Sequence, residues 1–232
     1  MKTIATIPCH NEESHIGDVV SRSLRQVDTV FVVDDGSTDD TAHIAEALGA
    51  SVVRHPTNQG PGAAVATGFS AALKADADVV VTLDGDGQHN PDEIPLLSSL
   101  VVKGQADIVV GSRFLGNWCT VPLYRRFGIW VITVLYNLGA SQQLRDSQSC
   151  FRAYSRRILE EIPLTERGFG FSVEILIRAR RRGYRIVEAP ISCVYHSDSH
   201  SLNPVHHGLV VALKVLQLRL RRDWKWPGSN KH

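Results

Sequence analysis

Two carboxylates separated by one glycine follow an apolar run in the middle of the chain, where residues 79–83 lead into Asp84, Gly85 and Asp86. In α/β sheets the carboxyl ends of the strands open onto the crevice that binds the ligand. Neighbouring carboxylates repel each other unless a divalent cation joins them, and Mg²⁺ and Mn²⁺ favour oxygen ligands together with substrate phosphates. We therefore expect Asp84 and Asp86 to be metal ligands, the alternative being a simple Asp-Gly turn.

A second apolar run, residues 30–33, ends in Asp34 and Asp35 and continues into Ser37 and Thr38. Either aspartate could accept hydrogen bonds from a nucleobase or a ribose. The two hydroxyl residues suit the N-cap of a following helix, whatever the aspartates bind. The segment thus indicates a polar pocket at a second strand end.

Glycines at positions 60 and 62 could let the backbone approach a ligand before a helix begins, so Gly62 is a candidate substrate-binding residue. The segment imitates the GxGxxG motif of dinucleotide-binding proteins. However, its sixth position is Val65, and five residues separate Arg54, at the end of a strand, from Gly60. The sequence also lacks a P-loop pattern. We therefore expect neither NAD binding nor a P-loop.

These motifs require a scaffold of alternating strands and helices. Short apolar, β-branched runs predict strands at residues 3–7, 30–33, 52–53, 79–83 and 108–110. Helix signals lie between them, at residues 14–23, 38–48, 62–74 and 91–102. After Arg113 we expect an apolar segment over 124–138, a strand over 149–154, a helix over 172–182 and a strand over 185–189. This order predicts an α/β fold with a doubly wound, mostly parallel sheet.

The composition is that of a globular protein with one core. The chain has 232 residues, of which 43% are hydrophobic and 21% charged, which disfavours a disordered chain, a coiled coil and a polytopic membrane protein. Its four cysteines are far apart and form no CxxC pair, so we expect neither a disulfide framework nor a structural zinc site. The cysteines and the lack of a leader pattern indicate a cytoplasmic location.

Charge is divided unevenly along the chain: residues 1–100 contain 5 Lys or Arg and 15 Asp or Glu, whereas residues 101–232 contain 20 and 9. An acidic half can hold a metal and sugar hydroxyls, and a basic half can bind phosphates or an anionic surface. Solvated helix faces are the alternative explanation. We expect no nucleic-acid partner, and the sequence leaves open whether the chain forms a homo-oligomer.

The C-terminal segment combines an amphipathic pattern with basic and aromatic residues. Apolar positions in residues 204–222 recur at helical spacing, and Trp224 and Trp226 follow. Such a helix could dock on the protein's own core or rest among lipid headgroups. The apolar residues 129–138 are too few for the roughly 20 that a membrane-spanning helix requires. We divide the chain into one domain, residues 1–202, with halves at 1–113 and 114–202, and a basic C-terminal helix and tail at 203–232.

Five patterns occur in one order along the chain: Pro-x-x-Asn-Glu-Glu, Val-Asp-Asp-Gly-Ser, Asn-x-Gly-x-Gly, Asp-x-Asp within DGDGQH, and Gly-Ser-Arg. Together they resemble the motifs of glycosyltransferase family 2. A later segment, Asp146 to Arg152, is similar to the Asp-x-x-Ser-Gly-Phe-Arg pattern of the dolichyl-phosphate mannose synthase-like and polyprenyl-phosphate glycosyltransferases, with Cys150 in place of the glycine.

The resemblance implies a GT-A fold, with a Rossmann-like nucleotide-binding half followed by an acceptor half. It implies that Asp84, Asp86 and Gln88 surround Mg²⁺ or Mn²⁺, which neutralises the leaving diphosphate. The residues that it places around the substrates are Pro8, His10, Glu12, Asp34 and Asp35 at the nucleotide, and Arg113, Arg125 and Arg126 at the acceptor phosphate. A phosphate acceptor needs no strong base, whereas for a hydroxyl acceptor Asp146 is our candidate base.

The implied function is an inverting, metal-dependent transfer of a hexose from a GDP- or UDP-sugar to a polyprenyl or dolichyl phosphate, at the cytosolic face of a membrane. Attachment to the membrane surface would use residues 124–138 and 204–226. One alternative is a transferase with a soluble hydroxyl acceptor. Others are a haloacid-dehalogenase-type phosphatase, suggested by Asp84 and Asp86, and a nucleotide-sugar-binding module without turnover.

The segment after the last expected strand departs from the family pattern. Related synthases carry an Arg and a Gly-x-Ser-Lys pattern there, whereas this chain has Tyr195 to Leu202 with His196 and His200. Either histidine could contact the diphosphate or the metal, and we take His196 as a candidate substrate-binding residue. A structural role is the alternative.

Overall fold

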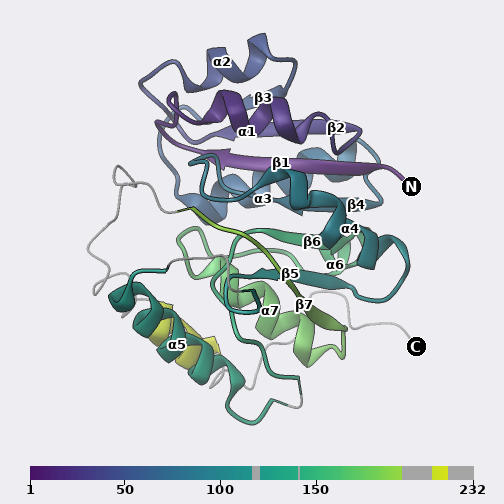
Figure 1. Cartoon of the computed structure of the whole chain (residues 1–232), viewed down its shortest axis with the longest axis vertical. Coiled ribbons are helices and arrows are strands. Elements are labelled where there is room, and N and C mark those ends of the chain that lie inside the picture. Colours follow the sequence, from purple (N-terminus) through teal and green to yellow (C-terminus); the bar gives the residue numbers. More distant parts are fainter. Residues whose placement is uncertain (117–120, 141, 195–210, 219–232) are drawn as a thin grey trace.

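The computed structural model describes residues 1–116, 121–140, 142–194 and 211–218, which form one seven-stranded sheet in the order β3-β2-β1-β4-β6-β5-β7 (Figure 1). The strands are β1 (Thr3–Cys9), β2 (Thr29–Asp34), β3 (Ser51–Arg54), β4 (Val79–Thr82), β5 (Ile108–Ser112), β6 (Arg152–Ser155) and β7 (Ile186–Pro190). The helices are α1 (Ile16–Ser23), α2 (Thr41–Ala47), α3 (Pro61–Lys74), α4 (Ile94–Val102), α5 (Leu123–Asn137), α6 (Arg156–Glu161) and α7 (Phe171–Arg181), with a 3-10 turn, η1 (Pro91–Glu93), and a helical stretch at 211–218.

Most neighbouring strands are parallel. β1 pairs in parallel with β2 and β4, β2 with β3, and β5 with β7, whereas β6 runs antiparallel between β4 and β5. The expected mostly parallel α/β sheet is confirmed. The reversed direction of β6 was not expected, because a run of four residues carries no signal for the direction in which it pairs.

Helices cover both faces of the sheet (Figure 1). α1, α2 and α4 contribute side chains such as Val20 and Leu97 to one apolar cluster. α3, α5, α6, α7 and the helix at 211–218 contribute side chains such as Phe69, Ile158 and Val215 to the other. The fold is therefore doubly wound, as expected.

The central strand β4 is buried on both faces. Val80 belongs to one apolar cluster, and Val79 and Val81 belong to the other, because successive side chains of a strand point to opposite faces. Full burial stabilises each of these side chains by about 1.5–3 kcal/mol. The continuous apolar run thus makes a rigid support for the carboxylates that follow it.

The carboxyl ends of β1, β2, β4 and β5 lie at the same edge of the sheet. The register pairs Cys9 with Asp34 and Thr6 with Thr82, so the segments that follow these strands begin next to one another. This edge gathers the motifs of four distant segments of the chain.

The sheet is continuous across position 113, the boundary between the two expected halves. β5 precedes that boundary in sequence, yet it pairs with β6 and β7, which follow it. The two halves therefore share one β-sheet.

α5 has two different faces and lies at the periphery of the molecule (Figure 1). Its buried side chains are Ile132, Thr133 and Tyr136. Its exposed apolar side chains include Leu123, Phe127, Trp130 and Val134, which recur every three or four residues, and Tyr124 is exposed beside them. Among the described residues, no helix combines the length and the apolar character needed to cross a membrane.

Candidate active site

The loop after β4 carries the two aspartates that we expect to bind metal. The Asp84 side chain is 37% exposed, so it is recessed but reachable. Asp86 is half-buried, and its Oδ1 accepts a hydrogen bond of 3.0 Å from the backbone N–H of Gln88. This contact shapes the turn and leaves the second oxygen of Asp86 for a ligand.

Negative charge accumulates around this loop. Burial, and then the nearby charge of Asp86, raise the pKa of Asp84 to about 7, although Arg113 opposes the shift. Burial, followed by the charges of Asp86 and Asp39, also raises the pKa of Glu12 to about 7. A divalent cation would relieve this repulsion, so the donor set fits the expected metal.

The described residues contain no cluster of three or more His, Cys, Asp or Glu side chains suited to a metal ion. Asp84 and Asp86 would therefore supply only part of a coordination shell. Mg²⁺ commonly binds one or two carboxylates and takes its other ligands from water and substrate phosphates. This pattern suits an ion that binds together with a diphosphate.

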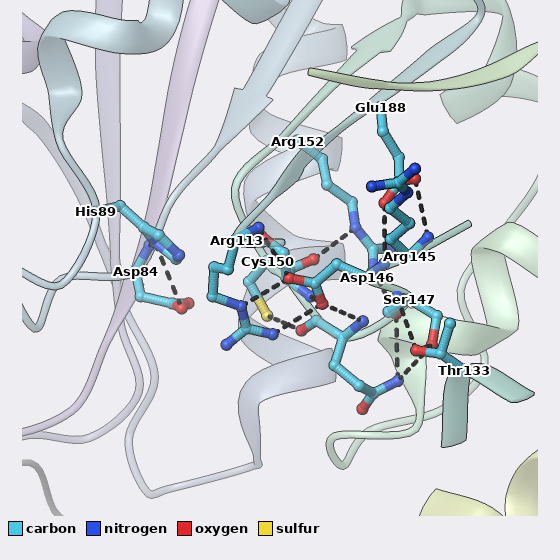
Figure 2. A network of polar contacts seen from close by, with 12 residues as sticks. Asp84, His89, Arg113, Thr133, Arg145, Asp146, Ser147, Cys150, Arg152 and Glu188 are labelled. Atoms are coloured by element: carbon cyan, nitrogen blue, oxygen red, sulfur yellow. Dashed lines mark hydrogen bonds and ion pairs between the residues drawn. The ribbon is translucent and has the colours of Figure 1, made fainter. Parts of the chain in front are cut away.

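His89 supports the same loop from its buried side. It is buried, and burial above all lowers its pKa to about 4, so the ring is neutral at neutral pH. Its Nδ1 accepts the backbone N–H of Asp84 at 3.5 Å and lies 3.7 Å from the Asp84 carboxylate (Figure 2). His89 therefore has a structural position behind the candidate metal ligand.

The residues expected at the nucleotide lie at the carboxyl ends of β1 and β2 or directly after them. His10 is exposed, and its Nδ1 lies 2.9 Å from the backbone oxygen of Asp35. Pro8 is half-buried within β1. Asp34 is buried, and its Oδ1 accepts the backbone N–H of Ser37 at 2.9 Å. The structure brings these residues together, with Asp34 holding the turn after β2.

Asp35 is occupied by contacts within the protein. Its carboxylate accepts the backbone N–H groups of Gln59 (2.9 Å) and Gly60 (2.8 Å) and lies 2.7 Å from Nδ1 of His55. The other ring nitrogen of His55 is 3.0 Å from the Thr67 hydroxyl. Asp35 thus shapes the glycine loop, and its expected contact with the nucleotide stays a prediction. We did not expect His55, whose only sequence signal is its place directly after β3.

Gly62 contacts the protein's own backbone. Its N–H donates to the carbonyl of Arg167 at 2.7 Å, and a Cβ at this position would lie 2.2 Å from the carbonyl oxygen of Glu166. We expected this glycine to admit a ligand. The loop that approaches it is the segment before α7, so the close spacing of Gly60 and Gly62 serves packing between distant parts of the chain.

Arg113 and Asp146 form a two-point ion pair. Nε and Nη2 of Arg113 donate to the two oxygens of Asp146 at 2.7 and 2.8 Å, and the Arg113 backbone N–H adds a contact of 3.2 Å. Asp146 is fully buried and also accepts the N–H groups of Gln148 and Ser149. Burial alone would raise the pKa of Asp146, but the charge and hydrogen bonds of Arg113 outweigh it and lower the pKa.

This geometry does not suit the role of base that we expected for Asp146 with a hydroxyl acceptor. A base needs an accessible oxygen and a pKa near the working pH. Asp146 has neither, and it instead fixes the direction of the Arg113 guanidinium. Figure 2 shows the Arg113 side chain between Asp84 and the loop that carries Asp146.

Arg152 supports that loop from within the core. It is fully buried, and its guanidinium donates to the backbone carbonyls of Ser149 (2.7 Å), Ser172 (2.7 Å) and Ser147 (2.9 Å). We had not assigned it a role, although it ends the Asp-x-x-Ser-Cys-Phe-Arg segment. Cys150 lies beside Arg113 in Figure 2, and burial raises the pKa of its thiol, so the thiol stays protonated at neutral pH.

The remaining expected residues lie around α5 and beyond β7. The guanidinium of Arg126 is 6.0 Å from the ring of Phe114, and that of Arg125 is 6.0 Å from the ring of Tyr124. Arg125 thus lies near Tyr124 of the same helix, and Arg126 lies near Phe114, which follows β5. His196 lies outside the described residues, as do residues 203–210 and 219–232.

The chain that leads to His196 runs along the β4 loop. The carboxylate of Glu93 accepts the N–H of Ser192 at 3.0 Å, and the N–H of Val194 donates to the carbonyl of Gln88 at 3.0 Å. His89 and Cys193 form an isolated antiparallel bridge. The segment after β7 thus begins beside the candidate metal ligands.

Comparison with known proteins agrees with this geometry. Residues 5–163 match the model of Glycosyl transferase family 2. The chain is 30% identical over 238 residues to the UDP-N-acetylglucosamine--dolichyl-phosphate N-acetylglucosaminyltransferase of Methanococcus voltae, covering 92% of this chain and 94% of that relative. It is 33% identical over 213 residues to the dolichyl-phosphate hexose transferase of Haloferax volcanii, covering 91% of each.

A solved structure extends the likeness to three dimensions. Glucosyl-3-phosphoglycerate synthase from Mycobacterium tuberculosis, in complex with Mn²⁺, UDP-glucose and phosphoglyceric acid, matches with a TM-score of 0.73 and 25% sequence identity, covering 94% of this chain and 79% of that chain. The expected GT-A fold is confirmed, and the phosphatase alternative is wrong. From its motifs, fold and relatives, the chain belongs to glycosyl transferase family 2 and is a glycosyltransferase.

Proposed function

We propose that this glycosyltransferase moves a hexose from a GDP- or UDP-sugar to a polyprenyl or dolichyl phosphate, with inversion at the anomeric carbon and with Mg²⁺ or Mn²⁺. The observation that carries the proposal is the position of Arg113 (Figure 2) beside Asp84 and Asp86, two neighbouring carboxylates whose negative charges repel each other. Asp84 and Asp86 suit the metal that accompanies a donor diphosphate, and Arg113 suits an acceptor phosphate. Relatives named for transfer to dolichyl phosphate support this choice of acceptor.

The donor side of the reaction uses the β4 loop. Asp84 and Asp86 would hold the metal, with Gln88 as the third expected ligand. When bound, the ion acts as a Lewis acid that stabilises the charge developing on the leaving diphosphate. His89 holds the backbone of Asp84 in place, and Glu12 adds to the negative potential that attracts a cation.

The acceptor side uses Arg113. A phosphate oxygen of the acceptor attacks the anomeric carbon while the bond from that carbon to the diphosphate breaks, so the configuration inverts. The acceptor is already an anion, so no side chain has to remove a proton. Arg113, held at two points by Asp146, gives this anion a fixed cationic partner.

The lipid acceptor places the reaction at a membrane surface. The exposed apolar side chains of α5, which include Phe127 and Trp130, suit insertion among lipid headgroups, and Arg125 and Arg126 lie at the start of the same helix. At 211–218, Val211 and Val215 are buried in the core, whereas Leu213 and Leu216 are exposed. We therefore assign the main membrane contact, at the cytosolic face, to α5.

A second acceptor class has its own support. The matching synthase from Mycobacterium tuberculosis was crystallised with phosphoglyceric acid, a small molecule that also carries a phosphate. An arginine such as Arg113 can bind a phosphate on either kind of acceptor.

The test is a transfer assay with GDP- and UDP-hexoses, Mn²⁺ or a chelator, and either polyprenyl phosphate in vesicles or 3-phosphoglycerate in solution. We expect a lipid-linked sugar and free nucleoside diphosphate, formed only with metal. Product with 3-phosphoglycerate alone would assign the soluble acceptor. Metal-dependent nucleotide binding without product from either acceptor would identify a binding module. Asp84→Ala should lower transfer about 10³-fold, whereas Asp18→Ala, on the surface of α1, should leave it unchanged.

A further inference from the structure

The loop of residues 144–149 determines where Arg113 points, because it carries Asp146. It lies between the end of α5 and β6 and has no regular secondary structure of its own. A loop of this kind keeps one conformation only if other parts of the protein hold its backbone. The structure shows which side chains do so.

One end of the loop is held by α5. The side chain of Asn137 pairs with both backbone groups of Leu144, at 2.7 Å to its carbonyl and 3.0 Å from its N–H. The hydroxyl of Thr133 accepts the N–H of Ser147 at 3.2 Å and lies 2.9 Å from its hydroxyl oxygen. The fully buried Arg152 holds the loop from the other side, as described above.

The centre of the loop is held by Glu188, a half-buried residue of β7. Its two carboxylate oxygens accept the N–H groups of Arg145 and Asp146, each at 2.8 Å (Figure 2). The register of the sheet places Glu188 beside Val110 on β5, the strand that leads directly to Arg113. One carboxylate thus ties the backbone of Asp146 to β7, which pairs with β5, the strand that directly precedes Arg113.

We infer that Glu188 is a positioning residue for Arg113: it orients Asp146, and Asp146 orients the guanidinium toward the acceptor phosphate. The inference rests on the proposed function, because it assigns Arg113 to that phosphate. In this inference Glu188 acts through the backbone of Arg145 and Asp146 and is assigned no contact with substrate or metal. An arginine side chain has many rotamers, so a fixed carboxylate partner decides how much of the time the guanidinium points in a productive direction.

Loss of Glu188 should disturb this orientation more than the fold. Asn137, Thr133 and Arg152 still hold the loop on both sides of Arg145 and Asp146. Without Glu188, however, two adjacent N–H groups lose their acceptors, and the Asp146 backbone can turn. The expected result is a loss of acceptor use by a protein that stays folded.

The experiment is a double-mutant cycle between Glu188→Ala and Arg113→Ala, measured as transfer from the nucleotide sugar to polyprenyl phosphate in vesicles. In the otherwise unchanged protein, Glu188→Ala should lower kcat/KM for the acceptor about tenfold and leave the Kd of the nucleotide sugar unchanged. Glu188→Gln keeps one acceptor oxygen and should lose less. In the Arg113→Ala background, Glu188→Ala should have no further effect.

Glu174 provides a matched control, because its carboxylate also accepts two consecutive N–H groups, those of Thr165 and Glu166, at 3.0 Å each. The fold-losses in kcat/KM caused by Glu174→Gln and by Arg113→Ala should multiply in the double variant, since Glu174 acts on a different loop. The inference is overturned if the fold-losses of Glu188→Ala and Arg113→Ala also multiply. It is likewise overturned if a folded Glu188→Ala protein has the same kcat/KM for the acceptor as the unchanged protein.

The failure of this inference can be told from failure of the proposed function. If the unchanged protein transfers sugar to neither acceptor, the proposed function fails. The same four proteins are then compared by urea unfolding, where coupling between Glu188 and Arg113 supports the structural link and additive effects overturn it.

Discussion

Two aspartate sites lie on either side of Arg113 (Figure 2), and at each of them removal from solvent favours the neutral carboxyl. At Asp84 the charge with the largest effect is another carboxylate, Asp86, and the pKa rises to about 7. At Asp146 the nearest charge is Arg113, and the pKa falls. The protein therefore balances the charge of one carboxylate with its own cation, whereas neighbouring negative charge raises the pKa of the other. The contrast supports the proposal that Asp84 binds a cation and that Asp146 positions a side chain.

The largest effect should come from removing the carboxylate of Asp84, whose pKa is raised by burial and neighbouring negative charge. We expect Asp84→Ala to lower transfer about 10³-fold, because the charge on the leaving diphosphate loses its main partner. Thermal unfolding should show a folded protein, and calorimetry should show that Mn²⁺ no longer strengthens nucleotide binding. Metal-dependent binding of normal strength in this variant would contradict the assignment of Asp84.

Removing the carboxylate of Asp146, which pairs with Arg113, should lower stability and also cause a loss of transfer. Asp146→Asn leaves the mostly buried Arg113 without its anionic partner, which should lower the free energy of unfolding by about 3 kcal/mol, measured by urea titration. Combining it with Arg113→Met removes both charges and should restore part of that stability, while transfer stays lost. No recovery in the double variant would argue against the ion pair as the cause.

The exposed face of α5 should be independent of both aspartate sites. We expect Phe127→Ser combined with Trp130→Ser to weaken binding to anionic vesicles about tenfold, because two large apolar side chains no longer enter the interface. Nucleotide and metal binding should not change. Leu96→Ser, at an exposed apolar position of α4, serves as the control, and an equal loss in that variant would show that α5 has no special role.

The smallest effect should be the pH dependence of the metal-free protein, where the two aspartates act in opposite directions. The raised pKa of Asp84 means that the folded state binds the proton more tightly, so stability should fall as the pH rises from about 4 to about 7. The lowered pKa of Asp146 contributes stability that is lost as the pH falls below about 4.

The loss of stability between about pH 4 and about pH 7 should be only on the order of 1 kcal/mol, because solvent reaches the partly exposed Asp84. Urea titrations at several pH values measure it. Glu12, whose pKa is also raised to about 7, contributes to the same slope. Asp84→Asn should therefore reduce the neutral slope and leave the acid side unchanged, and an undiminished neutral slope in this variant would assign it to Glu12.

The sequence predicts the strand-end motifs well because each is local. Apolar runs followed by Asp84 or Arg113 give the strand, its end and the polar group in adjacent residues. The same logic cannot distinguish a carboxylate that faces a ligand from one that faces the protein. Asp35 and Asp84 follow similar runs, yet Asp35 is occupied by His55 and by two backbone groups of the glycine loop.

The contacts that the sequence does not predict join distant segments. Glu188 accepts the N–H of Asp146, which is 42 residues away, and Gly62 donates to Arg167. Such contacts depend on the strand order, in particular on the insertion of β6 between β4 and β5. No periodicity or motif encodes a strand order, so these partners become visible only in the fold.

The position of β6 also has a consequence for how the chain is made. β4 and β5 leave the ribosome before β6, which lies between them and pairs with both. Until residues 152–155 emerge, β4 has an unpaired backbone edge, and such edges favour association between chains. The strand that precedes the candidate metal ligands is therefore completed late in synthesis, and a fragment that ends near residue 113 should aggregate instead of folding on its own.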